Sequence, residues 1–180
     1  MMAQSATTGD EGTTFVLGGA RSGKSRYGES LVTALPHPWV YIATAEVRDD
    51  EMAARIAAHK AHREAGWQTI EAPHELPEAL HAAPQGAAVL VDCLTLWLSN
   101  LMHGKFKIDT MTARLEEALA ARVGTTVLVS NEVGLGIVPE NALAREFRDA
   151  QGLLNQRLAA HAGRVILMVA GLPLYLKGSP

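Results

Sequence analysis

Two patterns of hydrophobic and polar residues alternate along this chain. Short aliphatic and β-branched runs predict strands at 14–17, 39–43, 88–92, 125–130 and 165–170, with a weaker run at 68–71. Longer stretches carry apolar residues at helical spacing, and they predict helices at 24–33, 49–64, 95–102, 110–122 and 140–161. This alternation is typical of a parallel sheet wrapped by crossover helices, so we expect an α/β fold.

The two ends of the chain depart from this pattern. Residues 1–12 are rich in Ser, Thr and Gly and lack the basic start and apolar middle of a secretory signal, so we expect a disordered tail. No later connection is long enough to be a domain linker, which predicts a single domain over 13–180. Residues 171–180 are partly apolar and predict either an antiparallel edge strand or a contact with a neighbouring subunit.

A phosphate-binding motif separates the first predicted strand from the first predicted helix. Residues 18–25 read GGARSGKS and fit G-x-x-x-x-G-K-[ST]. The glycines let backbone N–H groups turn toward phosphate oxygens, and the following helix presents its positive end to the same anion. The motif in this context predicts a three-layer P-loop NTPase-like fold with a mostly parallel central sheet. Its nucleotide-binding residues are Gly18, Gly19, Ala20, Arg21, Ser22, Gly23, Lys24 and Ser25.

Three side chains are expected to act on the triphosphate and its metal ion. Lys24 should reach the β and γ phosphates, and the Ser25 hydroxyl should bind Mg²⁺. Asp92 ends the apolar run at 88–92, so its carboxylate should face the phosphate loop and hold Mg²⁺ directly or through water. The alternative for Asp92 is a helix cap, because a helical pattern follows it.

The predicted helix at 49–64 carries two histidines on a basic edge. Its first turn is acidic and its last turn basic, as the helix dipole favours. Helical spacing places Arg55, His59, His62 and Arg63 within one arc of about 100°. A neutral imidazole is a nucleophile, and nearby guanidinium groups bind phosphate. The alternatives are a solvated helix flank or a zinc site, but no further His or Cys cluster supplies the third and fourth ligands that zinc needs.

Composition and charge narrow the class of protein. Of the 180 residues, 48% are apolar and 19% charged, as in an ordinary globular protein. The formal charge of −3 gives no broad field for nucleic acid or an anionic membrane. The single cysteine, Cys93, cannot form an internal disulfide, and the late apolar stretch at 165–176 is too short to span a bilayer. We therefore expect a cytoplasmic protein.

Four segments resemble one enzyme family, the bifunctional adenosylcobinamide kinase / adenosylcobinamide-phosphate guanylyltransferases of cobalamin biosynthesis. They are GGARSGKSRY at 18–27, YIATA at 41–45, DDEMAARIAAHKAHR at 49–63 and NEVGLGIVPENALAREFRDAQGLLNQRLA at 131–159. The resemblance implies phosphorylation of adenosylcobinamide with ATP or GTP, followed by transfer of GMP from GTP to the product. It further implies a guanylylated histidine, which by motif position is His59, and a homotrimer.

The resemblance also extends the nucleotide site beyond the phosphate loop. By motif position, the added nucleotide-binding residues are Ala43, Thr44, Ala45, Lys60, Ala61, His62, Arg63, Glu71 and Asp92. This sequence departs from the family pattern where Ala61-His62 replaces the Asp-Gly that often follows the His-Lys pair. The change puts side-chain contacts there in doubt. For Glu71 the alternative is an exposed acid that ends an edge strand.

Two other functions compete with this interpretation. A simple P-loop small-molecule kinase would use His59 only to bind phosphate, and it would transfer the γ-phosphate without trapping a nucleotide. A non-enzymatic nucleotide switch is disfavoured because the chain has no N-K-x-D guanine-reading motif. The phosphate loop contacts groups common to ATP and GTP, so it does not fix the base preference of the kinase step.

Overall fold

The computed structural model of the chain describes residues 12–46 and 66–180, and within them one sheet organises the molecule. Its strand order is β3-β2-β4-β5-β1-β6-β7. All neighbouring strands are parallel except β6 and β7, which are antiparallel. The strands are β1 (Thr13–Gly18), β2 (Trp39–Ala43), β3 (Trp67–Glu71), β4 (Ala88–Asp92), β5 (Thr126–Asn131), β6 (Arg164–Val169) and β7 (Leu172–Lys177).

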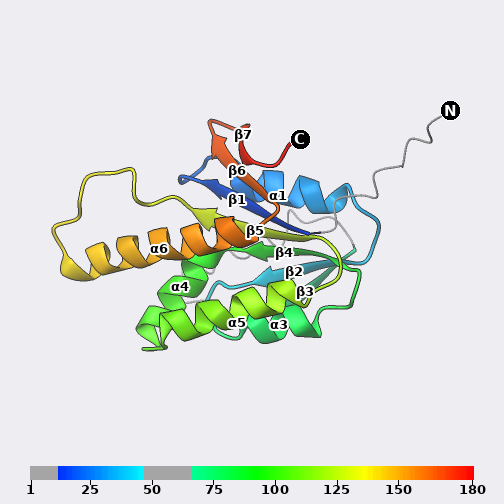
Figure 1. Cartoon of the computed structure of the whole chain (residues 1–180), viewed down its shortest axis with the longest axis horizontal. Coiled ribbons are helices and arrows are strands. Elements are labelled where there is room, and N and C mark those ends of the chain that lie inside the picture. Colours follow the sequence, from blue (N-terminus) through cyan, green and yellow to red (C-terminus); the bar gives the residue numbers. More distant parts are fainter. Residues whose placement is uncertain (1–11, 47–65) are drawn as a thin grey trace.

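Helices cover both faces of this sheet, which gives three layers (Figure 1). One face packs against α1 (Lys24–Thr33). The opposite face is covered by α3 (Leu76–Ala82), α4 (Leu94–His103), α5 (Ile108–Ala120) and α6 (Ala142–His161). The expected three-layer fold with a mostly parallel sheet is therefore confirmed, and the C-terminal segment forms the antiparallel edge strand.

The central strands are apolar on both faces because both are covered. In β4, Leu90 belongs to the core beneath α1, whereas Val89 and Val91 belong to the core beneath α3 to α6. This explains why such strands read as continuous aliphatic runs rather than as alternating patterns.

Helix α1 approaches the sheet closely at Gly28. A Cβ there would lie 3.0 Å from Val129 and 3.1 Å from Leu90, closer than a side chain tolerates without a shift of the neighbours. The glycine thus lets α1 lie directly against β4 and β5. Because β1 leads straight into this helix, the N-terminus of α1 is fixed at the carboxyl edge of the sheet.

The structure contains one helix that was not predicted, and one predicted helix falls outside the residues that it describes. The helix α3 was missed, because it is short and begins with Leu76-Pro77, where proline reads as a chain break although it is tolerated at a helix start. The helix predicted at 49–64 lies entirely outside the described residues, so it stays a prediction. Elsewhere the predicted bounds differ by one or two residues, as for α5, predicted at 110–122 and observed at Ile108–Ala120.

Candidate nucleotide site

The loop between β1 and α1 has the backbone geometry of an anion cradle. Gly23 precedes the helix with φ of 92°, a left-handed conformation that favours glycine, and Arg21 also has a positive φ of 56°. No side chain caps the N-terminus of α1. The first-turn N–H groups therefore keep their capacity to donate to a bound anion, as expected for phosphate binding.

Close packing holds this loop in place from below. A Cβ at Gly18 would lie 2.4 Å from the Ser22 hydroxyl oxygen and 2.9 Å from the Met168 carbonyl oxygen, so only glycine fits there. From the β6–β7 turn, the Gly171 N–H donates a hydrogen bond to the Ser22 carbonyl at 3.0 Å. The C-terminal hairpin thus supports the loop directly.

Lys24 folds back over the loop. Its Nζ donates to the Gly19 carbonyl at 3.0 Å, which keeps the ammonium group beside the cradle. Burial lowers the pKa of Lys24 from its ordinary value, and the negative charge of nearby Asp92 opposes that shift. The lysine and the carboxylate are therefore electrostatic neighbours in the same site.

Asp92 lies at the carboxyl end of β4, on the same face of the sheet as α1. Its side chain is half-buried and accepts a hydrogen bond from the Tyr41 hydroxyl at 3.3 Å. It makes no N-cap to α4, because the cap residue of that helix is Cys93 and has no side-chain cap bond. The helix-cap alternative for Asp92 is thus not what the structure contains.

Ser25 and Asp92 are hard oxygen donors of the kind that Mg²⁺ prefers. Within the described residues, no cluster of three or more His, Cys, Asp or Glu side chains could hold a metal ion by itself. Two protein oxygens completed by phosphate oxygens are a common arrangement for Mg²⁺, so these residues fit the expected ion.

Thr44 is engaged within the protein through every one of its polar groups. Its hydroxyl accepts from the Cys93 N–H at 2.8 Å and donates to the Cys93 carbonyl at 2.7 Å. Its N–H donates to the Asp92 carbonyl at 3.4 Å, and its carbonyl accepts from Asn100 Nδ2 at 2.8 Å. Thr44 therefore joins the ends of β2 and β4, a role that the sequence did not reveal.

The thiol of Cys93 is buried behind this junction. Burial and the negative charge of Asp92 raise the pKa of Cys93 to about 11. The group is consequently a neutral thiol near pH 7 and is a poor candidate for a nucleophile.

Sheet register brings two further predicted residues, Ala43 and Glu71, to the level of Asp92. Ala43 at the end of β2 pairs with Glu71 on one side and with Asp92 on the other. Glu71 ends the edge strand β3 and is exposed. Ala45 follows Thr44 and is partly exposed. These residues share the carboxyl edge of the sheet with the phosphate loop.

Several predicted site residues lie outside the described part of the chain, between 47 and 65. They are His59, Lys60, Ala61, His62 and Arg63. Their roles stay predictions. Strand β2, which precedes that segment, ends at the carboxyl edge of the sheet beside the site, whereas β3, which follows it, begins at the opposite edge, where Trp67 pairs with Trp39.

One residue of this edge was not assigned a role from the sequence. Asn131 ends β5, which lies between β1 and β4, and its register partner is Gly18 of the phosphate loop. Its Oδ1 is buried and has no hydrogen-bond partner within the described residues. The signal available in the sequence was an amide at the carboxyl end of a predicted central strand, which we grouped with the loop that follows.

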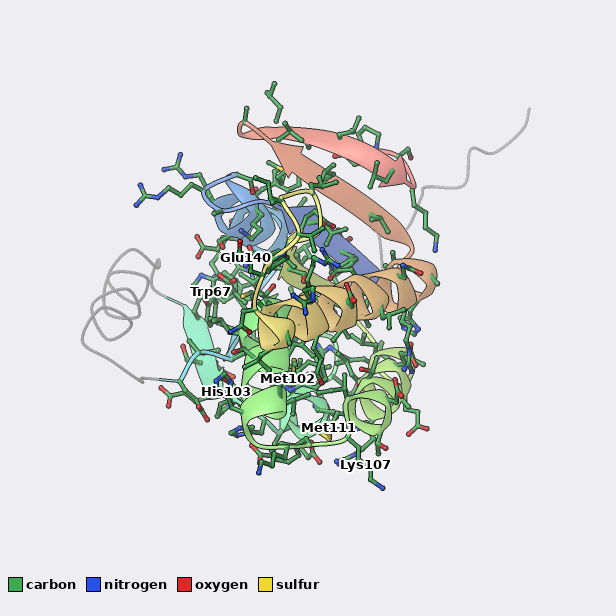
Figure 2. The ribbon with its side chains drawn as sticks, turned by 90° about the vertical axis from the view of Figure 1, so that its left-hand side faces the viewer. Trp67, Met102, His103, Lys107, Met111 and Glu140 are labelled. Atoms are coloured by element: carbon green, nitrogen blue, oxygen red, sulfur yellow. The ribbon has the colours of Figure 1, made fainter. Side chains whose placement is uncertain are left out.

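That loop, between β5 and α6, extends beyond the carboxyl ends of the strands (Figure 1). Figure 2 views the molecule from this side, and the loop with Glu140 labelled crosses in front of the sheet. It carries large exposed apolar side chains at Leu135 and Ile137, which are 86% and 97% exposed. The site is thus bordered by an apolar segment.

Among the described helices, none is long and apolar enough to cross a bilayer.

Comparisons with known proteins agree with this geometry. The sequence profile of the CobU family, described as cobinamide kinase / cobinamide phosphate guanyltransferase, matches residues 14–176. The bifunctional adenosylcobalamin biosynthesis protein CobP of Pseudomonas aeruginosa is 47% identical over 168 residues, which cover 92% of this chain and 97% of that protein. The corresponding protein CobU of Salmonella typhimurium is 42% identical, with 90% and 98% covered.

Solved structures are similar in fold at low sequence identity. A protein of Pyrococcus horikoshii OT3 from a structural study has a TM-score of 0.57 at 11% identity, over 94% of this chain and 87% of that chain. A KaiC-like protein from the same organism has a TM-score of 0.51 at 14% identity, over 87% and 71%. At such identities the likeness concerns the fold alone.

Proposed function

Because this chain belongs to the cobinamide kinase / cobinamide phosphate guanyltransferase family, we propose that it catalyses two successive reactions at one nucleotide region. The first phosphorylates adenosylcobinamide with ATP or GTP. The second transfers GMP from GTP to adenosylcobinamide phosphate and gives adenosylcobinamide-GDP. The observation that carries this proposal is near full-length similarity, at 41–47% identity, to proteins named bifunctional.

In the kinase reaction, this chain contributes positioning and charge. The first-turn N–H groups of α1 and the residues 18–25 hold the triphosphate, and Lys24 neutralises the β and γ phosphates. The substrate hydroxyl attacks the γ-phosphorus, and the nucleoside diphosphate leaves. The fold supports this role because the uncapped helix end and the lysine lie at one place.

Ser25 and Asp92 would hold Mg²⁺ beside the phosphates. When bound, the ion supplies positive charge that offsets the charge of the triphosphate. The half-buried position of Asp92 and its hydrogen bond from Tyr41 would orient the carboxylate for this purpose.

In the guanylyl transfer, His59 is the proposed nucleophile. A neutral ring nitrogen attacks the α-phosphorus of GTP, a P–N bond forms, and pyrophosphate leaves. The phosphate of the first product then attacks the same phosphorus and releases the histidine. The other proposed nucleotide-binding residues are Ala43, Thr44, Ala45, Lys60, Ala61, His62, Arg63 and Glu71.

Thr44 would act in this set without a free hydroxyl. Because its polar groups are engaged with Cys93, Asp92 and Asn100, it would serve by holding Ala43 and Ala45 at the site.

A labelling experiment tests the proposal. With α-³²P-labelled GTP and Mg²⁺, the protein should acquire label that is lost in acid and retained in base, because a phosphoramidate breaks in acid. His59→Ala should abolish the label. At saturating GTP, His62→Ala should still acquire label, because it removes a proposed binding contact and not the nucleophile. Absence of label in wild-type protein that phosphorylates adenosylcobinamide would leave only a simple kinase, an alternative that the names of the relatives do not favour.

The domain organisation, cellular location and oligomeric state of the enzyme are also proposals. We infer a single catalytic domain over 13–180, a cytoplasmic location and a homotrimer. Self-association is supported by exposed apolar side chains on the edge strand β7, where Leu172 is 70% exposed and Leu174 54%.

A further inference from the structure

Asn131 occupies the strand end that separates the phosphate loop from Asp92. Strand β5 lies between β1 and β4, and Asn131 pairs in register with Gly18. Side chains alternate along a strand, so Asn131 lies on the same face as Val127 and Val129, which contact α1 near Gly28. Its side chain therefore belongs to the face that carries Lys24 and Asp92.

The main chain of Asn131 is anchored by side chains of two helices. Its N–H donates to Thr95 Oγ1 of α4 at 2.8 Å, and its carbonyl accepts from Asn155 Nδ2 of α6 at 3.1 Å. Asn155 is itself held through its Oδ1, which accepts from Ser130 at 2.9 Å and from Gln151 at 2.9 Å. Such a network fixes the strand end and with it the backbone from which the side chain of Asn131 projects.

The amide oxygen of Asn131 is nevertheless unsatisfied. Oδ1 is buried and accepts no hydrogen bond from any residue that the structure describes. A buried acceptor without a partner is destabilising, because it loses its hydrogen bonds to water without replacement. This strand end is anchored on two sides, yet it keeps an unpaired acceptor beside a phosphate loop. Such an acceptor is typical of a ligand-binding group.

We propose that the side-chain amide of Asn131 aligns the kinase reaction, with Oδ1 accepting from the attacking hydroxyl and Nδ2 donating to the terminal phosphoryl group. This inference rests on the proposed function. An amide suits both contacts because it carries an acceptor and a donor on one planar group. Asn131 lies in register with Gly18 and on the strand next to that of Asp92, so it shares the edge where the phosphates, rather than the base, would bind.

The step is a transfer of one phosphoryl group. The hydroxyl oxygen forms a bond to the γ-phosphorus, and the bond from that phosphorus to the β–γ bridging oxygen breaks. The electron pair leaves with the nucleoside diphosphate, and the hydroxyl proton passes to an oxygen of the transferred group. The amide takes no proton, so its contribution is alignment and hydrogen bonding.

The role proposed for Asn131 concerns only one of the two reactions of the site. Guanylyl transfer breaks the bond between the α and β phosphates, so a group that serves the γ-phosphorus and its attacking hydroxyl should contribute little there. Replacing Asn131 should therefore impair the kinase reaction selectively.

The experiment compares Asn131→Ala with wild type in four measurements. Kinase kcat should fall roughly 10²-fold, as for loss of a group that stabilises transition-state charge, while the rate of histidine labelling by α-³²P-GTP stays unchanged. The preference for a non-hydrolysable triphosphate over the diphosphate, measured by calorimetry, should also decrease. The melting temperature of the nucleotide-free variant should be no lower than that of wild type, because the substitution removes an unsatisfied acceptor.

Asn141→Ala is the matched control. Asn141 caps α6 through a hydrogen bond from Ala144 N–H to its Oδ1 at 3.1 Å. Losing this cap should lower the melting temperature by roughly 2–4 °C and should leave the ratio of the two activities unchanged.

Distinct outcomes separate failure of this inference from failure of the proposed function. Unchanged kinase turnover in Asn131→Ala, or an equal loss of both activities, would overturn the inference. If wild-type protein did not phosphorylate adenosylcobinamide, the proposed function would fail instead. The ratio of triphosphate to diphosphate affinity would then still decide whether Asn131 contacts the terminal phosphate, because that measurement needs no acceptor substrate.

Discussion

Thr44 joins two strand ends through one small buried side chain. Its hydroxyl bonds to both the N–H and the carbonyl of Cys93, and the residue is fully buried. Thr44→Val keeps the shape and removes the hydroxyl, which leaves two buried backbone groups without this partner. We expect it to lower the free energy of unfolding by about 1–3 kcal/mol, measured by urea denaturation.

Thr44→Ser is the control for this prediction. It keeps the hydroxyl and loses only a methyl group, so it should stay closer to wild type than Thr44→Val. Equal stability of the valine variant and wild type would show that the junction does not hold the two strands.

Lys24 gives the site a predictable dependence on pH. Burial lowers its pKa, and a lysine loses its charge as pH rises through that value. Nucleotide affinity should therefore decline at a lower pH than for an exposed lysine, as measured by calorimetry between about pH 7 and 10. Lys24→Arg, whose charge persists throughout this range, should give a flat profile; an identical decline in both proteins would contradict the assignment.

For single residues, the sequence predicts functional groups whose partners lie nearby in the chain. The phosphate loop could be identified because Gly18, Lys24 and Ser25 are adjacent in the chain and their spacing is itself the mechanism. The structural role of Thr44 and the role proposed for Asn131 could not be identified in this way, because they depend on partners such as Cys93 and Gly18 that the chain brings close only on folding.

Helices α5 and α6 are joined by an ion pair. Arg157 Nε donates to Glu116 Oε1 at 2.9 Å, and this hydrogen bond lowers the pKa of Glu116. A carboxyl whose pKa is lower in the folded state contributes stability above its unfolded pKa and loses it as pH falls through the folded value. The pair should therefore stabilise the protein near neutral pH and not in acid.

Glu116→Gln tests this sign. Because both side chains are partly exposed, the pair should contribute about 0.2–1 kcal/mol, or a melting temperature lower by roughly 1–3 °C at pH 7. The difference should vanish in acid, below the folded pKa of Glu116. The exposed neighbour Glu117 serves as a control, since Glu117→Gln should have little effect at either pH. If the difference in melting temperature between Glu116→Gln and wild type persisted in acid, the effect would come from packing rather than from the ion pair.

The predictability of an element follows from how it is buried. Strands β2 and β4 were predicted with the observed bounds because continuous aliphatic runs such as 88–92 arise only when both faces are covered. The helix α3 was missed because its apolar residues cluster in a short segment that includes Pro77. For 171–180 the pattern left two roles open, since an edge strand with exposed leucines and an intersubunit contact have the same composition.

The molecule as a whole leaves one edge of its sheet apolar. Leu172 and Leu174 on β7 are 70% and 54% exposed, and exposed strand edges favour association. If the proposed homotrimer uses this edge, the double variant Leu172→Glu, Leu174→Glu should sediment as a monomer in analytical ultracentrifugation. Val123→Glu, at a residue 59% exposed, is the control and should leave the mass unchanged. An intact trimer in the double variant would place the interface elsewhere.

The β6–β7 turn is tied to the phosphate loop through the hydrogen bond from Gly171 to Ser22. The same hairpin therefore meets the nucleotide region at its turn and, in the proposed homotrimer, would meet a neighbouring molecule along its outer strand. Any displacement of the hairpin by a neighbour shifts the support of the loop, and thermodynamic reciprocity then requires occupancy of the loop to alter the strength of that association by an equal factor. Association of the subunits and binding of nucleotide would then be thermodynamically coupled, so the apparent affinity for nucleotide would depend on the protein concentration.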